Sequence, residues 1–389
     1  MFGSKKIGLL PKIILAIFLG VVCSLFLPIP IARIFETLNS LFSNYLGFVI
    51  PLIILGLVAP SIGDLGSRAG RLLIITTLIA YGSTIFSGYL SYFISTSSFP
   101  YILAGESMAS LDVAGKTAVA PYFTVEMPPL LSVTSALVLA FVLGLTLANC
   151  KGRGETIAAT IKEFKDLVMI IIEKSIVPLL PIYIFGIFLK LGVEGEVATV
   201  LGLFIKVIAL IFAMHIGLLL IQFSIAGVVA KKNPLKALVT MIPAYLTALG
   251  TQSSAATIPI TLEQTKLNGV RDDIAEFVVP LCATIHLSGS ILKIVACTLA
   301  IAWTTGMAID IELYTSYILM LGITMVAAPG VPGGAIMAAL ALLTSLLGFD
   351  ETQLGLMIAL YIAMDSFGTA GNVTGDGAIA LVVNRLVKG

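Results

Sequence analysis

Apolar residues along this chain form eight runs that are each long enough to cross a lipid bilayer as an α-helix. Because a helix rises 1.5 Å per residue, about 20 apolar residues span the hydrocarbon core. The first run lacks a small-residue cleavage site and continues to Pro28, so we expect a retained helix and not a signal peptide. The pattern predicts an all-α polytopic membrane protein with eight transmembrane helices. The runs are residues 7–28, 42–62, 70–96, 129–149, 166–191, 199–230, 270–305 and 353–384.

Two further apolar regions, residues 234–266 and 313–347, are interrupted in the middle by a polar or Gly/Pro-rich tip. The tips read GTQSSAAT (250–257) and AAPGVPGGA (327–335). An arm of about a dozen residues measures roughly 18 Å as a helix, against a hydrocarbon core of about 30 Å. Each region therefore predicts a re-entrant helical hairpin. Its tip must be buried in protein or line a water-filled cavity, because lipid cannot satisfy the backbone groups freed there.

Each hairpin is followed by an apolar segment with its own polar interruption. The interruptions are TIHLSGS (284–290) and YIAMDSFGTAGNVTGDG (361–377). A hairpin followed by a broken helix, twice, predicts an inverted repeat with a binding site between the two tips, if the hairpins enter from opposite faces. The alternative is that these glycines and prolines are ordinary kinks of membrane helices, which two such pairs make less attractive.

Composition agrees with a membrane protein, since 58% of residues are hydrophobic, 11% are charged and the mean hydropathy is +1.10. The net charge of +1 indicates no acidic partner, and we expect no binding of nucleic acid. Lys and Arg gather on alternate connections, which places both termini on the cytoplasmic side. The four cysteines form no CxxC pair, so we interpret them as small core residues and not as metal ligands or disulfides. They are Cys23, Cys150, Cys282 and Cys297.

The second interruption carries polar residues at spacings of 0, 4, 7 and 11, which are Asp365, Thr369, Asn372 and Asp376. At about 100° per residue they form one stripe along a helix. Such a ladder of oxygen atoms suits a hard cation or an ammonium group. A structural polar seam between helices is the alternative, but neither carboxylate has a basic partner on its own helix. An intramembrane aspartyl protease is disfavoured, because Val373 replaces the first glycine of a GxGD motif and both aspartates share one helix.

Other ionisable residues also lie inside apolar runs. His286 is a possible proton acceptor, or a neutral hydrogen-bonded histidine. Lys293 is costly there unless it is paired or reaches the interface. We interpret His215 and Lys206 as structural.

The segments TQSSAATIP, PLCATIHLSGS, GVPGGAIM and NVTGD resemble the dicarboxylate/amino acid:cation symporters, the family of glutamate and neutral amino acid transporters, and the resemblance covers essentially the whole chain. It implies a homotrimer in a prokaryotic inner membrane, with no enzymatic activity. Residues 1–69 and 128–198 would form a static scaffold. Residues 70–127 and 199–389 would form a transport domain that moves like an elevator, with the second hairpin as its extracellular gate.

The resemblance also implies roles for individual residues. Asp365 would hold the α-ammonium of an amino acid and Asn372 its α-carboxylate, with Thr369 beside the side chain. One sodium site would consist of the Asp376 carboxylate and the backbone carbonyls of Cys282, His286 and Asn372. A second sodium site would use backbone oxygens of Thr284 and the second hairpin. Backbone groups of both hairpin tips would complete the substrate site, namely those of Ser253, Ser254, Val331, Pro332 and Gly333.

Departures from the family pattern are informative. Acidic-substrate members place an arginine where this chain has Gly368, and some prokaryotic members place another where it has Gln252, so we favour a neutral amino acid. The sodium-coupled pattern NMDGT reads HLSGS here, and the hydroxyl of Ser288 cannot replace a carboxylate at a further sodium site. We favour coupling to Na⁺ with fewer sites. Coupling to H⁺ through His286, and the Lys293 ammonium in place of the missing ion, stay open.

Function classes other than symport find less support. A carrier of dicarboxylates or acidic amino acids is the main alternative within transport. A channel would give no reason for two re-entrant tips and an ammonium-binding carboxylate. No HExxH, GxSxG or Walker motif appears, so neither a common hydrolase nor an ATP-driven pump is indicated.

Overall fold

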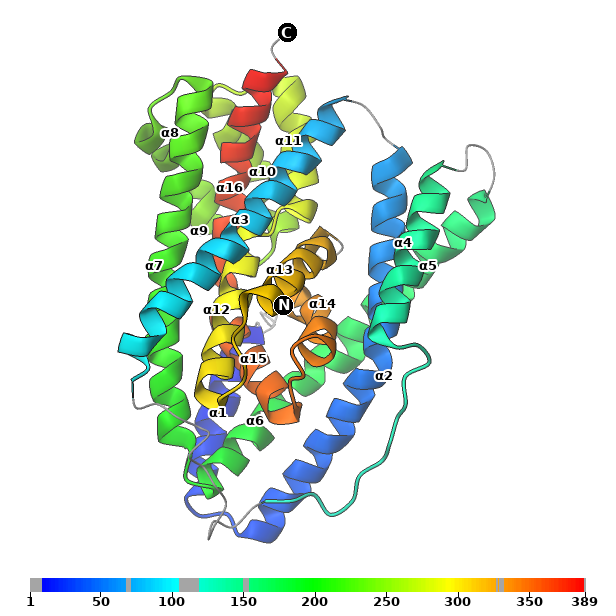
Figure 1. Ribbon diagram of the computed structural model, residues 1–389, viewed down its shortest axis with the longest axis vertical. Coiled ribbons are helices and arrows are strands. Elements are labelled where there is room, and N and C mark those ends of the chain that lie inside the picture. The colour runs from blue at the N-terminus through cyan, green and yellow to red at the C-terminus, as the bar shows by residue number, and fades with distance from the viewer. Residues whose placement is uncertain are drawn as a thin grey trace, which may run out of the picture.

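The structure is a computed structural model that describes residues 9–67, 71–104, 119–149, 154–326, 328 and 332–387, and its ordered elements in these ranges are helices (Figure 1). They are α1 (Leu9–Ser24), α2 (Ile29–Ser67), α3 (Arg71–Ile102), α4 (Val133–Asn149), α5 (Glu155–Ile171), the π-helical turn η1 (Ile172–Ile176), α6 (Val177–Val193), α7 (Val197–Ala230), α8 (Pro234–Thr240), α9 (Ile242–Thr251), α10 (Ser254–Leu267), α11 (Asp272–Ile285), α12 (Ser288–Thr305), α13 (Ile311–Val326), α14 (Gly334–Ser345), α15 (Glu351–Ala363) and α16 (Asp365–Leu386).

All eight predicted apolar runs fall on helices, although the described residues do not confirm eight separate spans. Five helical stretches are long and apolar enough to cross a membrane, and a sixth is the bent pair α15 and α16. The runs at 7–28 and 129–149 form α1 and α4, which are 16 and 17 residues long. An all-helical membrane architecture is therefore supported, while the predicted number of spans is not.

Helix α2 begins at Ile29, well before the predicted start at residue 42. The added turns are amphipathic and not apolar, so hydropathy alone misses them. Their polar side chains find partners in other elements: Glu36 accepts from Lys190 Nζ of α6 at 2.5 Å, and Arg33 Nε donates to the Ala120 carbonyl at 2.9 Å. Contacts between distant segments thus extend this helix beyond its apolar run.

The first hairpin, made of α8, α9 and α10, returns to the place where it begins. Asn233 caps the start of α8 by accepting a hydrogen bond from Lys236 N at 2.9 Å. Asn268, just after α10, donates to the Ala237 carbonyl at 3.0 Å and accepts a hydrogen bond from Lys232 Nζ. These contacts hold both ends of the hairpin together, as expected for a segment that enters and leaves on one side.

The second hairpin consists of α13 and α14, which pack against each other. In Figure 1 the connection before α8 lies at the upper end of the molecule, near the C-terminus, and the connection between α12 and α13 lies in the lower half. The two hairpins therefore start from opposite halves of the molecule. This arrangement agrees with the predicted inverted repeat.

Both segments that follow the hairpins are broken helices. The first break falls at His286 and Leu287, between α11 and α12. The second falls at Met364, where α15 and α16 meet at an angle of 59°. Backbone groups at such breaks are tolerated inside a membrane only where protein or a cavity surrounds them. The breaks thus place polar backbone in the buried centre of the molecule.

The helices pack in two groups that meet at the second hairpin and at α15, which contacts α1 and α6. One group has α2 against α4, α5 and α6, with α1 against α6. The other centres on α16, which packs against α7, α9, α11 and α12, while α3 covers α12. Helix α14 of the second hairpin contacts α2 and α4 of the first group. Nearly every residue of α12 and α16 is buried, so polar groups on these two helices must satisfy each other.

Candidate functional site

The two hairpin tips meet at the first turn of α16. Gln252, at the tip of the first hairpin, donates from Nε2 to the Ser366 hydroxyl at 3.0 Å. Gly333, at the tip of the second hairpin, donates from its backbone N–H to Asp365 Oδ2 at 2.7 Å. Consecutive residues of α16 thus contact the tips of hairpins that start from opposite halves of the molecule. The prediction of a site between the tips agrees with this geometry.

Asp365 forms a buried ion pair with Lys293 of α12. The Lys293 ammonium lies 2.9 Å from Asp365 Oδ1, 3.4 Å from the Met364 carbonyl and 3.5 Å from the centre of the Tyr361 ring. The Lys293 side chain is fully buried and that of Asp365 is 6% exposed. Since leaving either charge unpaired would cost about 3–5 kcal/mol, the pair is needed in this arrangement. Of the two possibilities for Lys293, a partner or a position at the membrane interface, the structure shows the partner.

Asn372 binds the first turn of α12. Its Oδ1 accepts from the backbone N–H groups of Gly289 at 2.8 Å and Ser290 at 3.2 Å, and its Nδ2 donates to the Ser290 hydroxyl at 3.0 Å. A Cβ atom at Gly289 would lie 2.5 Å from the Gly368 carbonyl, so glycine is required for this close approach of the two helices. One of the two Nδ2 hydrogens of Asn372 remains for a ligand.

Asp376 is paired with His286 at the other end of the stripe. His286 Nδ1 lies 2.8 Å from Asp376 Oδ1, and both side chains are buried. Within the described ranges, Asp376 Oδ2 has no hydrogen-bond partner. A buried, unpartnered carboxylate oxygen is what a desolvated cation would need as a ligand. The expected carbonyl of Cys282 accepts the His286 backbone N–H at 2.9 Å and keeps a second lone pair for a cation.

A hydrogen-bonded chain continues from His286 into α3 and α7. Ser83 Oγ lies 3.1 Å from His286 Nε2, and Gln222 Nε2 donates to Ser83 Oγ at 3.0 Å and to Ser288 Oγ at 3.1 Å. A neutral histidine with its proton on Nδ1 satisfies this chain, which agrees with the alternative of a hydrogen-bonded histidine. The proton-acceptor role of His286 stays a prediction. The Gln222 amide thus binds the hydroxyl of Ser288, at the position where the sodium-coupled pattern has a carboxylate.

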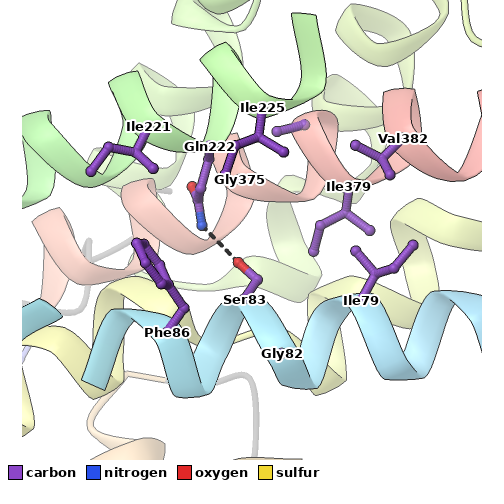
Figure 2. A pocket seen from close by; sticks show the side chains of 11 residues that line it. Ile79, Gly82, Ser83, Phe86, Ile221, Gln222, Ile225, Gly375, Ile379 and Val382 are labelled. Atoms are coloured by element: carbon purple, nitrogen blue, oxygen red, sulfur yellow. Dashed lines mark hydrogen bonds between the residues drawn. The ribbon is translucent and has the colours of Figure 1, made fainter. Parts of the chain in front are cut away.

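Figure 2 shows the bond between Gln222 and Ser83 at the wall of a pocket between α3, α7 and α16. The pocket has a volume of about 250 Å³, and its lining is almost entirely apolar. It contains Gly375 but neither Asp365 nor Asn372, so it is separate from the ion-pair end of the stripe. Sequence reasoning missed Ser83 and Gln222. Gln222 could have been identified from the sequence, because it is the lone amide side chain in the apolar run 199–230.

The predicted stripe on α16 is present, and its partners come from the segment 286–293. All four stripe residues are buried on one helix that begins at Asp365. The sequence argument against a structural seam used the lack of basic partners on the same helix. That argument is incomplete, because Lys293 and His286 supply partners from the adjacent helix. In this structure the stripe therefore forms a polar seam with the adjacent helix, and Asp376 Oδ2 is left without a hydrogen-bond partner among the described residues.

The remaining predicted residues lie at the following places. Ser253 caps α10, accepting from Ala256 N at 3.3 Å, and the buried Ser254 begins that helix. Thr284 is exposed and donates to the Leu281 carbonyl at 2.7 Å. Pro332 is half-buried beside Gly333, whereas Val331 lies outside the described residues. Thr369 is buried next to Gly368.

His215 and the cysteines, which were interpreted as structural, lie at the following places. His215 Nε2 donates to the Gly289 carbonyl at 2.9 Å and so supports the break before α12. Cys23, Cys282 and Cys297 are free thiols, and the last two are buried. Cys150 lies outside the described residues.

Comparison with known proteins identifies a family of transporters. The sequence profile of the sodium:dicarboxylate symporter family matches residues 9–386. The chain is 25% identical over 388 residues to the serine/threonine transporter SstT of Acinetobacter baumannii, covering 96% of this chain and 95% of that protein. It is 28% identical over 253 residues to the neutral amino acid transporter B(0) of Rattus norvegicus, covering 63% of this chain and 44% of that protein.

A third relative is the human excitatory amino acid transporter 2, to which the chain is 31% identical over 195 residues. This match covers 49% of the chain and 33% of the human protein, so it spans only about a third of that relative. The three relatives differ in the substrates their names give. Similarity alone therefore does not choose a substrate.

Proposed function

Because the chain belongs to the sodium:dicarboxylate symporter family, we propose that it is a secondary active symporter that couples uptake of a neutral amino acid to a cation gradient, with Na⁺ as the favoured cation. The single observation that carries this proposal is the buried stripe of α16, whose first turn contacts both hairpin tips. A site at the interface of two repeats, formed by interrupted helices, is an arrangement found in many secondary transporters that work by alternating access.

The substrate end of the site is the first turn of α16. Asp365 is the carboxylate for the substrate ammonium, and the free Nδ2 hydrogen of Asn372 is a donor for its carboxylate. Gly368 leaves no room for a guanidinium, because Lys293 already fills the adjacent space. Lys293 and Asp365 together carry no net charge, which suits a zwitterion better than an amino acid with a second carboxylate.

The cation end of the site is Asp376. Its unpartnered Oδ2 would ligate Na⁺, with the backbone carbonyls of Cys282, His286 and Asn372 completing the set. Thr284 and the second hairpin would supply a second site. Ser288 is bound by the Gln222 amide, and this supports fewer sodium sites than in relatives with a carboxylate there.

The two packing groups support a division into moving parts. Residues 1–69 and 128–198 would form the scaffold of a homotrimer in the inner membrane, with both termini in the cytoplasm. Residues 70–127 and 199–389 would form the transport domain, which moves as an elevator. The second hairpin would open as the gate, because its tip contacts Asp365 directly through Gly333.

The experiment is uptake of radiolabelled amino acids into vesicles that contain the purified protein, with either a Na⁺ or a H⁺ gradient imposed. We expect a Na⁺ gradient to drive accumulation of neutral amino acids such as serine, alanine or threonine. Preferred uptake of aspartate or glutamate would contradict the substrate assignment. Accumulation driven by a H⁺ gradient without Na⁺ would contradict the choice of cation.

A further inference from the structure

Lys293 supplies the positive charge paired with Asp365 at the substrate end of the site, yet the family resemblance gives it no role in substrate binding. It lies on α12, and its side chain is fully buried. Among the described acidic residues, only Asp365 lies within ion-pair distance of its ammonium. The face of the Tyr361 ring and the Met364 carbonyl complete its surroundings. The substrate end thus already contains a cation before any amino acid arrives.

The Lys293 ammonium fills the space beside Gly368. A Cβ atom at Gly368 would lie 2.8 Å from both Cε and Nζ of Lys293, which is closer than real side chains approach. A cationic side chain from α12 therefore projects toward α16 at a position where α16 itself has none. The absence of a side chain at Gly368 is what makes room for it.

An amino acid ammonium on Asp365 would have to displace Lys293. The displaced ammonium would then be buried without a counter-charge, which is strongly unfavourable. Asn372 has only one free amide hydrogen, so the substrate carboxylate needs another donor. Both needs are met together if Lys293 moves from Asp365 to the substrate carboxylate.

We propose that Lys293 is a substrate-binding residue: the Lys293–Asp365 pair exchanges partners with the zwitterion, so that Asp365 takes the ammonium and Lys293 takes the carboxylate. This inference rests on the proposed function and identifies the feature of the substrate that is selected. The site requires an ammonium and a carboxylate in one molecule. A ligand with only one of the two groups leaves one member of the buried pair without a partner.

The test measures binding of three matched ligands to the purified full-length protein in nanodiscs. They are a neutral amino acid taken up by the wild type, its amide, which has only the ammonium, and its 2-hydroxy acid analogue, which has only the carboxylate. We expect Lys293→Met to weaken amino acid binding at least about tenfold, as loss of a charge-assisted hydrogen bond does. The same variant should bind the amide as well as, or better than, the wild type.

Asp365→Asn should give the opposite selectivity. It should lose the amino acid and the amide, and bind the hydroxy acid more tightly than the wild type does, because Lys293 is then free for a carboxylate. This arm remains informative if Lys293→Met does not fold. Lys206→Met serves as the matched control, since it removes a lysine from the apolar helix α7. The control should leave all three affinities unchanged.

Three results would overturn the Lys293 proposal. Tighter amino acid binding by Lys293→Met would make Lys293 a mere competitor for Asp365. An equal loss of the amino acid and the amide, with a lowered melting temperature, would make the pair purely structural. Failure of Asp365→Asn to gain affinity for the hydroxy acid would remove the carboxylate role. If the wild type itself binds no neutral amino acid, the proposed function fails and this inference fails with it.

Discussion

Along α16, the polar residues of the stripe face one short segment that runs from His286 to Lys293. Asp365 meets Lys293, Asn372 meets Gly289 and Ser290, and Asp376 meets His286. Helical spacing predicted the stripe correctly, because residues on one face of a helix follow from sequence alone. Spacing could not predict the partners, since these depend on how two helices pack. The sequence analysis therefore assigned Asp365 to a substrate ammonium without identifying Lys293 as its partner.

Gly368→Ala tests the close fit at the ion pair. The new methyl group would lie 2.8 Å from the Lys293 ammonium, so the pair must shift. We expect a loss of about 1–3 kcal/mol in stability, as for overpacking in a dense core, together with weaker amino acid binding. Gly371→Ala is the control, because its methyl group would meet Gly289 Cα at an ordinary 3.6 Å. Thermal unfolding and ligand titration measure both effects, and equal behaviour of the two variants would contradict the fit.

At the scale of helices, the hairpins and the helix breaks were predictable, but their limits were not. The predicted first tip covered residues 250–257, whereas the structure interrupts the helices only at Gln252 and Ser253. Gln252 adopts a left-handed conformation with φ of 53°, and Ser253 caps the next helix at once. Polar residues that follow an N-cap, such as Thr257, can continue a helix when their side chains find partners. The polar composition therefore predicted a longer non-helical tip than the structure has.

The proposed gate role of the second hairpin depends on the backbone of Gly333. This residue has φ of +75°, and its N–H binds Asp365. Gly333→Ala should strain the backbone by about 1–2 kcal/mol and move the N–H, so we expect the affinity for the amino acid to fall several-fold. The measurement is ligand titration alongside thermal unfolding.

Gly348→Ala is the control for this prediction. Gly348 has nearly the same φ, +70°, but no atom lies within 4 Å of a Cβ built there, and it follows the hairpin instead of forming its tip. Both substitutions should cost similar stability. A similar loss of affinity in both variants would show that the contact between Gly333 and Asp365 does not hold the gate.

At the scale of the whole molecule, hydropathy predicted a membrane protein because apolar length is a local property. Hydropathy did not predict the amphipathic start of α2, since the polar side chains of Glu36 and Arg33 find their partners in residues distant in the sequence. The division into scaffold and transport domain came from family resemblance and not from composition. The packing of α2 with α4, α5 and α6, apart from α16 with its neighbours, supports that division. The proposed motion would carry the buried stripe and both hairpins together.

The measurement that tests the central claim most directly is sodium flux in vesicles that contain the purified protein. Labelled Na⁺ entry is recorded with and without a neutral amino acid, for the wild type and for Asp376→Asn. We predict that the amino acid increases Na⁺ entry through the wild type, because the proposed transport domain carries the amino acid and the cation across the membrane together. Asp376→Asn, which replaces the unpartnered carboxylate oxygen, should abolish that increase. Na⁺ entry that does not respond to the amino acid, or that responds equally in the variant, would contradict the account.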